Sequence, residues 1–343
     1  MAEITGVEAH PLRSVVTHQE DDATTSEQKI ELSVSEKALS DHGADVNTSN
    51  PQDMVSMEEE LWWSQFRHKM REPFSEFFGV FILILFGEGS IAQFILANGT
   101  RGDWQSVNWA WGIGVMLGVY ISGPSGGHLN PAVTFTNCIF RKFPWQKFPT
   151  YILAQTLGAF CASAIVYANF KSAIDLIEGH NIRTTTGGHP TAGIFSTYPT
   201  KFMTRTGMFF SEFIASTILM FCIYALQDNN NVGAGKLTPL GLFFVVFGIG
   251  ACFGWETGYA MNFARDFGPR VMSAMVGYGA EVFRADDHYF WIPMLAPFFG
   301  CTFGGWMYDV FLFTGDSPVN TPWMGFKRLM IGPGRRLVES SEA

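Results

Sequence analysis

The sequence predicts an all-α membrane protein with six transmembrane helices and two re-entrant half-helices, arranged as an inverted three-plus-three repeat. Three observations lead to this fold class: a low content of charged residues, six long apolar segments, and one motif that occurs in both halves. Of the 343 residues, 47% are hydrophobic and 15% are charged, whereas roughly 25% of the residues of a soluble domain are charged. Most of the chain is therefore expected to lie in lipid.

The negative charge of the chain is concentrated in its first 60 residues. They contain 14 acidic and three basic residues, although the net charge of the whole chain is −9. A polar, aromatic-poor segment of this kind cannot bury enough apolar surface to fold. We expect an acidic disordered cytoplasmic tail over residues 1–66, which is a phosphorylation target, binds a partner or is only solvated. The basic residues form no stripe, so no nucleic acid is expected as a partner.

Six apolar segments each approach or exceed the roughly 20 residues that a helix needs to cross a bilayer. They cover residues 74–97, 107–122, 149–170, 207–227, 238–256 and 289–314. The five cysteines lie in apolar surroundings without ligand spacing, which indicates buried thiols and neither a metal site nor a cofactor. These segments lie within a membrane domain over residues 67–318, and a short cytoplasmic C-terminal tail over residues 319–343 follows.

Basic residues are modestly enriched on one side of the six segments. The residues on this side are Arg67, Lys69, Arg71, Arg141, Lys142, Lys147, Lys236, Lys327, Arg328, Arg335 and Arg336. The positive-inside rule makes this side cytoplasmic. We expect a multi-pass protein of the plasma membrane with both termini in the cytoplasm, and Asn98, in an Asn-Gly-Thr sequon, outside.

A repeated motif divides the membrane domain into two halves, at about 70–170 and 206–315. Glu76 follows a serine and precedes an apolar run, and so does Glu212, 136 residues later. Asn130 recurs in the same way as Asn262, 132 residues later. Each half contains three segments, and an odd number means that the second half enters the membrane from the opposite side. The repeat is therefore inverted.

The segments 123–140 and 257–273 are predicted to be re-entrant loops that end in half-helices. Asn is a favourable N-cap, and Pro131 would fall at the first helical position, where its missing N–H is harmless. Irregular backbone at membrane depth must line a water-filled cavity or be buried in protein. Two helix N-termini meeting near the midplane would make it positive and repel cations. The amide groups of Asn130 and Asn262 are expected to face this lumen as donors.

The two loops resemble those of the aquaporin and glycerol-facilitator superfamily, the major intrinsic proteins, over about residues 70–315. The sequences that carry the resemblance are Ser125-Gly-Gly-His-Leu-Asn-Pro-Ala-Val-Thr134 and Gly258-Tyr-Ala-Met-Asn-Phe-Ala-Arg-Asp-Phe-Gly-Pro-Arg270. Asp266 resembles the signature of the aquaglyceroporin branch. The resemblance implies a passive channel for glycerol, water and other small neutral solutes, which excludes protons and ions, and a homotetramer in the lipid bilayer. It implies no enzymatic activity.

The resemblance also assigns residues to the pore. The midpoint would be formed by Asn130 and Asn262, with Pro131 and Phe263 beside them; the family usually has Pro where this chain has Phe263. The constriction would be formed by Trp111, Gly250, Tyr259 and Arg265. There, aromatic rings would pack the carbons of a polyol, Arg265 would donate to its hydroxyls, and Gly250 would leave room. From the residues alone, Trp111 and Tyr259 could instead be interfacial anchors.

Four further residues are expected to support the loops: Glu76, Glu212, His128 and Asp266. By resemblance, the two glutamates accept hydrogen bonds from the backbone of the loops. Glu88 is left open, facing either an outer vestibule or the lipid headgroups. Gly158 with Ala162 and Gly300 with Gly304 predict close helix crossings between the two halves. The segment 171–206 is expected to be an exposed loop, with a pH-sensing role for its histidines as the alternative.

Two other functions remain open from the sequence. The first is a channel of the same fold that prefers water, gases or peroxide and restricts glycerol because of Phe263. The second and more remote function is that of an ion-coupled secondary transporter, for which Glu76 and Glu212 would have to bind the coupling ion. An intramembrane enzyme is not expected, because no nucleophile–histidine pair or carboxylate dyad falls near the midplane.

Overall fold

The computed structural model describes residues 61–319, and these residues form helices, turns and loops without a β-strand. Most of the tail predicted over residues 1–66 and nearly all of the C-terminal tail predicted over 319–343 lie outside the described residues. One difference falls within them. Helix α2 (Trp62–Lys69) occupies positions assigned to the disordered tail, because its aromatic residues were counted with the acidic segment that precedes them.

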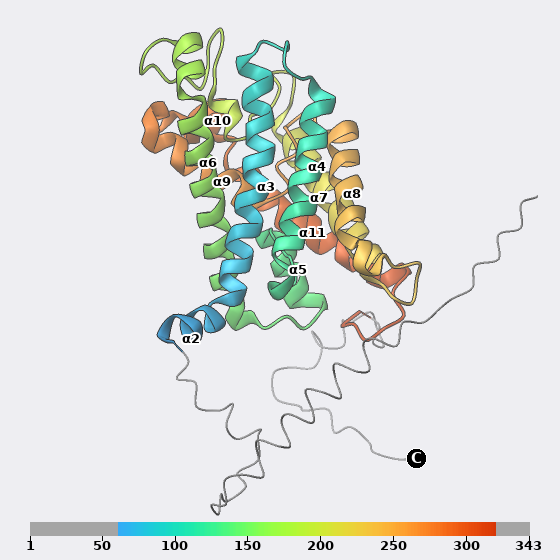
Figure 1. Ribbon diagram of the computed structural model, residues 1–343. Helices are drawn as coiled ribbons and strands as arrows, with labels where there is room; N and C mark the ends of the chain where they lie inside the picture. Colours follow the sequence, from blue (N-terminus) through green and yellow to red (C-terminus); the bar gives the residue numbers. More distant parts are fainter. Residues whose placement is uncertain (1–60, 320–343) are drawn as a thin grey trace, which may run out of the picture. The chain divides into compact units, whose positions relative to one another are not determined.

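Six long helices and two short ones make up the bundle within residues 61–319. The long helices are α3 (Arg71–Leu96), α4 (Trp104–Ile121), α6 (Phe148–Glu178), α7 (Arg205–Gln227), α8 (Thr238–Phe253) and α11 (Trp291–Phe311). The short helices are α5 (Pro131–Phe140) and α9 (Phe263–Ser273), and a further helix, α10 (Glu281–His288), precedes α11. Figure 1 shows α3, α4 and α6 standing side by side as nearly parallel rods.

The six long helices match the six predicted spans, and the largest difference is at the end of α6. This helix continues to Glu178, past the predicted limit at residue 170. An ion pair between Lys171 and Asp175, four residues apart, stabilises the added turns. Four of the helices, α3, α6, α7 and α8, are both long and apolar enough to cross a membrane. Helices α4 and α11 have 18 and 21 residues, but their mean hydropathy is lower than that of these four helices.

The helices pack as two equivalent sets of four. In the first set, α3 contacts α4 and α6, and in the second set α7 contacts α8 and α11. The sets meet where α4 packs against α8. Each short helix packs against the last long helix of the other set, so that α5 lies on α11 and α9 lies on α6. The two halves are therefore interlocked through their short helices.

Gly158 and Gly300 allow close helix crossings, but these two crossings lie inside each half. A Cβ atom at Gly158 of α6 would overlap the carbonyl oxygen of Phe77 in α3. A Cβ atom at Gly300 of α11 would overlap the carbonyl oxygen of Phe213 in α7 in the same way. The sequence predicted these residues at crossings between the halves, and that prediction is wrong. The pairing differs because the first and last long helices of one half are direct neighbours.

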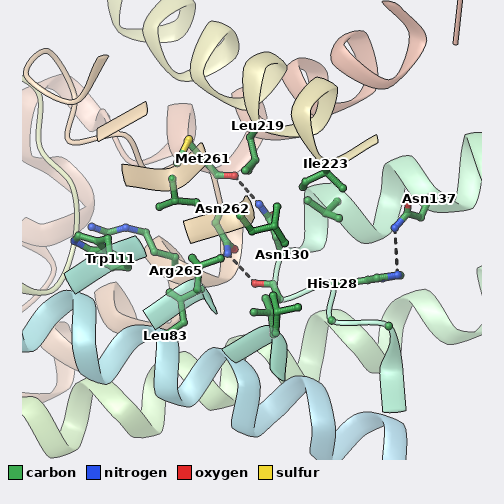
Figure 2. Close-up of a pocket in the computed structure, with 18 of the residues that line it drawn as sticks. Leu83, Trp111, His128, Asn130, Asn137, Leu219, Ile223, Met261, Asn262 and Arg265 are labelled. Atoms are coloured by element: carbon green, nitrogen blue, oxygen red, sulfur yellow. Dashed lines mark hydrogen bonds between the residues drawn. The ribbon is translucent and has the colours of Figure 1, made fainter. Parts of the chain in front are cut away.

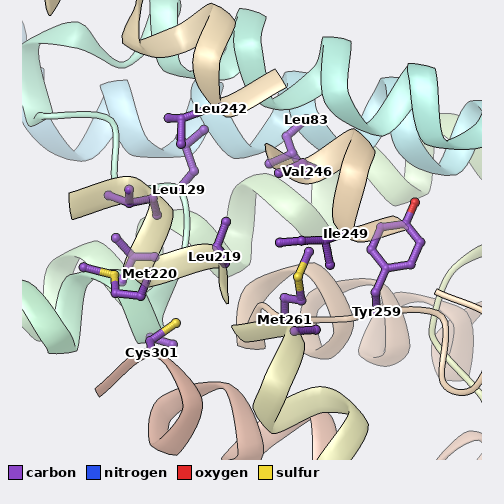
Figure 3. Close-up of a cluster of buried hydrophobic side chains, with 14 of the residues drawn as sticks. Leu83, Leu129, Leu219, Met220, Leu242, Val246, Ile249, Tyr259, Met261 and Cys301 are labelled. Atoms are coloured by element: carbon purple, nitrogen blue, oxygen red, sulfur yellow. The ribbon is translucent and has the colours of Figure 1, made fainter. Parts of the chain in front are cut away.

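The tips of the two re-entrant loops lie inside the hydrophobic core. Figure 3 shows Leu129 and Met261 among side chains from the surrounding helices, including Leu83, Leu219 and Leu242. Both tip residues are at most 5% exposed. Apolar packing from four helices therefore holds the loop tips at the centre of the bundle, where the short helices begin.

Candidate functional site: a lumen between two half-helices

Two asparagines cap the short helices in the same way. Asn130 and Asn262 both have extended backbone with φ of −151°, and each side-chain oxygen accepts a hydrogen bond from the second helical N–H. The donors are Ala132 N and Ala264 N, both at 2.9 Å. Pro131 occupies the first helical position of α5, where no N–H is needed. Both helices therefore begin at the asparagines.

The residue before each asparagine adopts a left-handed backbone conformation. Leu129 has φ of 53° and Met261 has φ of 51°, a conformation that costs energy for a residue with a side chain. The main-chain oxygens of these two residues accept hydrogen bonds across the midplane. Asn130 Nδ2 donates to Met261 O at 2.7 Å, and Asn262 Nδ2 donates to Leu129 O at 2.8 Å (Figure 2). The strained backbone thus serves to present these oxygens.

These cross-bonds alter the expected arrangement of donors at the midpoint. The sequence placed both amide groups toward the lumen as free donors. An amide group has two N–H bonds, and in each asparagine one of them is already donated to the opposite loop. One N–H of each amide remains for a passing oxygen atom. Each asparagine is also held in place at both its oxygen and its nitrogen.

Two buried carboxylates hold the loops from the helices behind them. Glu76 in α3 accepts hydrogen bonds from His128 N, Leu129 N and the Ser125 hydroxyl. Glu212 in α7 accepts the equivalent bonds from Ala260 N, Met261 N and the Thr257 hydroxyl, at 2.7–2.9 Å. Both glutamates have an exposed fraction of 0%. The carboxylates thereby fix the left-handed residues Leu129 and Met261 through their N–H groups.

The first loop has additional support that the second loop lacks. Gln155 Nε2 in α6 donates to Glu76 Oε2 at 2.7 Å and also contacts the Thr134 hydroxyl at 3.2 Å. The His128 ring lies between the Thr134 hydroxyl and the side chain of Asn137, at 3.1 and 3.2 Å. The sequence did not assign Gln155 a role. Its one available signal was a buried amide in an otherwise apolar span.

The second loop is anchored by an ion pair within its own helix. Arg270 Nε donates to Asp266 Oδ1 at 2.7 Å, and both side chains are at most 1% exposed. The other Asp266 oxygen accepts from the backbone N–H and the hydroxyl of Thr197, at 2.8 and 2.6 Å. The sequence assigned no role to Arg270 or Thr197. Arg270 could have been found, because it lies four residues after Asp266 on a helix.

A cavity of about 80 Å³ runs past the two asparagines. One part of its wall is apolar and comes from Leu83, Val115, Val119, Leu219, Ile223, Leu242 and Val246. The other part is polar and comes from the loops, including Asn130, Asn262, His128 and backbone around Gly126 and Ala260. Figure 2 shows the asparagine pair in the middle, with Arg265 and Trp111 toward one end and His128 with Asn137 toward the other. The lumen is therefore amphipathic along its length.

A second cavity, of about 170 Å³, continues beyond the first. Trp111, Tyr259 and Arg265 line both cavities and so separate them. The guanidinium carbon of Arg265 lies 4.4 Å from the centre of the Trp111 ring, and Arg265 is 5% exposed. Arg265 also donates a hydrogen bond to Phe195 O at 3.4 Å. Two aromatic rings and one cation thus surround the narrow point between the cavities.

Three of the expected pore residues line neither cavity. A Cβ atom at Gly250 would lie 2.8 Å from Cζ of Tyr259, so the missing side chain makes room for the tyrosine ring. Tyr259 then donates from its hydroxyl to Asn108 Oδ1 at 2.8 Å, a partner that the sequence did not indicate. Pro131 is buried behind the lumen. The Phe263 ring packs against Phe267 and Phe298 instead, 5.1 and 6.2 Å between ring centres.

Glu88 faces neither an outer vestibule nor the headgroups, the two positions that the sequence left open. Its exposed fraction is 0%, and neither carboxylate oxygen makes a hydrogen bond among the described residues, although the Ser163 hydroxyl lies close by. The loop 171–206, predicted to be exposed, is shorter than expected, because α6 takes up its first turns. Part of its later stretch is buried and not exposed, since Ala192, Ile194 and Phe195 pack into a hydrophobic cluster. Arg183 in this loop pairs with Asp175 at 2.7 Å.

The crossing helices, the paired half-helices and the lumen define a multi-pass membrane channel for small solutes. This chain belongs to the major intrinsic protein family, whose pattern matches residues 63–308. The resemblance and the fold class drawn from the sequence are thereby confirmed. Members of this family are channels, so the chain is a channel and not an enzyme.

Named relatives agree with this assignment. The chain is 68% identical to "Aquaglyceroporin-9" of Botryotinia fuckeliana (strain B05.10) over 306 residues, which cover 88% of this chain and 67% of that protein. It is 61% identical to "Probable aquaglyceroporin-2" of Gibberella zeae over 303 residues, 88% of both chains. The crystal structure of the aquaglyceroporin from Plasmodium falciparum superposes with a TM-score of 0.64 at 33% identity, covering 71% of this chain and 96% of the other.

Proposed function

We propose that this chain is an aquaglyceroporin, a passive channel that conducts glycerol, water and other small neutral solutes and excludes protons and ions. The observation that carries the proposal is the narrow point formed by Trp111, Tyr259 and Arg265 between two cavities. A polyol has carbon on one side and hydroxyls on the other, which suits two aromatic faces opposite a guanidinium group. The names of the relatives support the same solute class.

Beyond the narrow point, the lumen also has one apolar wall and one polar wall. The apolar wall from α3, α4, α7 and α8 faces the carbon atoms, and the loop backbone with Asn130 and Asn262 faces the hydroxyls. The helix N-termini at the midpoint contribute partial positive charge, and Arg265 adds a full charge at the narrow point. Cations are therefore repelled at two places. The free N–H of each asparagine orients a passing water molecule and interrupts a chain of hydrogen-bonded protons.

The proposal extends to how the channel sits in the cell. Residues 1–66 and 319–343 are cytoplasmic tails, and residues 67–318 form the channel domain in the lipid bilayer. The modest excess of basic residues on one side of the six spans, counted along the sequence and including those of residues 319–343, supports this orientation. We further propose a homotetramer in the plasma membrane, as the family resemblance implies.

A swelling assay in proteoliposomes tests the proposed solutes. Purified full-length protein is expected to raise glycerol permeability well above that of empty vesicles, and to leave sorbitol permeability unchanged. Trp111→Ala and Tyr259→Ala are expected to lower the ratio of glycerol to water permeability, because the aromatic faces are lost. Glycerol permeability equal to that of empty vesicles would refute the proposal.

The alternative hypothesis, a channel that prefers water, gases or peroxide, depends on Phe263 restricting the lumen. The position of the Phe263 ring argues against this hypothesis. Because Phe263 lies against Phe267 and Phe298 rather than in the lumen, Phe263→Pro is expected to leave glycerol flux nearly unchanged. A large gain in flux would favour the alternative. An ion-coupled transporter is disfavoured, because Glu76 and Glu212 are already engaged with the loops.

A further inference from the structure

Helix α2 carries a ridge of largely exposed aromatic side chains, and Phe66 in this ridge also contacts Phe74 of α3, with 6.0 Å between ring centres. Leu61, Trp62, Trp63 and Phe66 are between 36% and 76% exposed, and α2 contains no buried residue. The Trp62 and Phe66 rings stack with centres 5.6 Å apart. Figure 1 shows α2 at one end of the bundle, turned away from the axis of α3. The ridge thus lies at the end of the bundle where α3, which begins at Arg71, starts to cross the membrane.

Basic side chains lie next to this ridge. Arg67, His68 and Lys69 form the last turn of α2, and Arg71 follows at the start of α3. All four are exposed. Within residues 61–319, none of the ion pairs involves them. Among residues 61–319, the cluster therefore presents positive charge without an ion-pair partner beside exposed aromatic rings.

Beside these basic residues is a cavity of about 560 Å³. His68, Lys69 and Arg71 line one part of it, and residues at the start of α6 line the other. The acidic residue in its wall, Glu72, already accepts two hydrogen bonds from Lys147 and one from the Tyr151 hydroxyl. Since Glu72 and Lys147 neutralise one another, the charge that remains at the cavity is positive.

We propose that α2 lies in the membrane interface and that this cavity binds the headgroup of an anionic phospholipid. Aromatic rings are favoured at the boundary between headgroups and acyl chains, and an amphipathic helix with basic residues binds anionic membranes in this way. The basic side chains, which have no ion-pair partner within residues 61–319, complement a phosphodiester and a carboxylate, and the ridge places them at headgroup depth. Only the assignment of this lipid site to the cytoplasmic leaflet, where anionic lipids are enriched, depends on the orientation given under the proposed function.

Native mass spectrometry of the purified full-length channel tests this site, with dioleoyl-phosphatidylserine and dioleoyl-phosphatidylcholine as probes. Wild-type protein is expected to retain phosphatidylserine at least tenfold more tightly than phosphatidylcholine. A basic residue near an anionic surface contributes roughly fivefold to affinity. The variant Arg67→Gln/Lys69→Gln/Arg71→Gln is therefore expected to lose on the order of 100-fold in phosphatidylserine affinity.

A matched variant removes three exposed charges elsewhere: Lys201→Gln/Lys236→Gln/Arg284→Gln. It is expected to keep wild-type affinity, and equal loss in both triple variants would overturn the proposal. Trp62→Ser/Trp63→Ser is expected to weaken phosphatidylserine binding while the basic cluster is intact. All variants are expected to conduct glycerol normally in phosphatidylcholine vesicles, so a failure of the lipid site is distinct from a failure of the channel function.

Two competitors distinguish the lipid from other anions. Millimolar inorganic phosphate is expected to leave bound phosphatidylserine in place, and displacement would show a site for free anions instead. The second competitor is a synthetic peptide of residues 1–60, which has 14 acidic and three basic residues. Displacement of the lipid by micromolar peptide would assign the cavity to this acidic segment and overturn the proposal.

Discussion

Three glutamates are buried in the first helices of the two halves, and they differ in their hydrogen bonding. Glu76 and Glu212 each accept hydrogen bonds on both carboxylate oxygens, whereas neither oxygen of Glu88 has such a partner in the described part of the chain. A buried ionised carboxylate is costly unless it is paired or hydrogen-bonded. The same chemical change at two of these sites should therefore affect stability in opposite directions.

Glu212→Gln is expected to destabilise the channel, and Glu88→Gln is its matched control. A glutamine at position 212 must turn an N–H donor toward one of the donors Ala260 N, Met261 N or Thr257 Oγ1, which leaves a buried group unsatisfied at a cost of about 1–3 kcal/mol. At Glu88 the neutral amide is cheaper to bury than the carboxylate. Thermal unfolding in detergent should show a lower midpoint for the first variant and an equal or higher one for the second. Equal losses would contradict this interpretation.

Residue types and spacing were enough to find the asparagines, the glutamates and Arg265, because each repeats or falls within a specific motif. Residue types and spacing do not predict in which direction a side chain on a short helix points. Phe263 turns toward α11 and Gly250 accommodates Tyr259, and both depend on which neighbour packs nearby. Asn108 and Thr197 were missed because their partners are distant in sequence.

At the scale of the helices, close crossings fix how each half packs. Gly300 of α11 touches the backbone of α7, whereas a Cβ atom at Gly248 of α8 would meet nothing within 4 Å. Except at the end of α6, the spans were predicted to within a few residues, since long apolar segments leave little choice in lipid. The small residues alone did not predict which helices are neighbours, because a small residue indicates a close helix contact but not which helix makes that contact.

Gly300→Ala is expected to lower the stability of the channel by about 1–3 kcal/mol, because the added methyl group must push α11 away from α7. Gly248→Ala serves as the control, and it should be neutral or slightly stabilising, since alanine favours helix over glycine. Thermal unfolding midpoints in the same detergent compare the two variants. If Gly300→Ala were as stable as Gly248→Ala, the crossing would not be tightly packed.

At the scale of the whole molecule, the proposed orientation can be tested with single cysteines. Lys201 and Lys236 are exposed and lie before and after α7, so one crossing helix separates them. In a background in which the exposed Cys252 is replaced by serine, Lys201→Cys should react with an impermeant maleimide on intact cells. Lys236→Cys should react only after the cells are permeabilised. The opposite pattern would place both termini outside.

The cross-bonds between Asn130 and Met261 and between Asn262 and Leu129 have a consequence for biosynthesis. They are reciprocal, as in the interface of a symmetric dimer, yet both partners belong to one polypeptide. The first half leaves the ribosome while its asparagine still lacks the oxygen that it will contact. A chain that ends after α6 would leave the first re-entrant loop in lipid, with the amide of Asn130 lacking its acceptor, Met261 O. Completion of the second half is therefore the step that makes the first half stable.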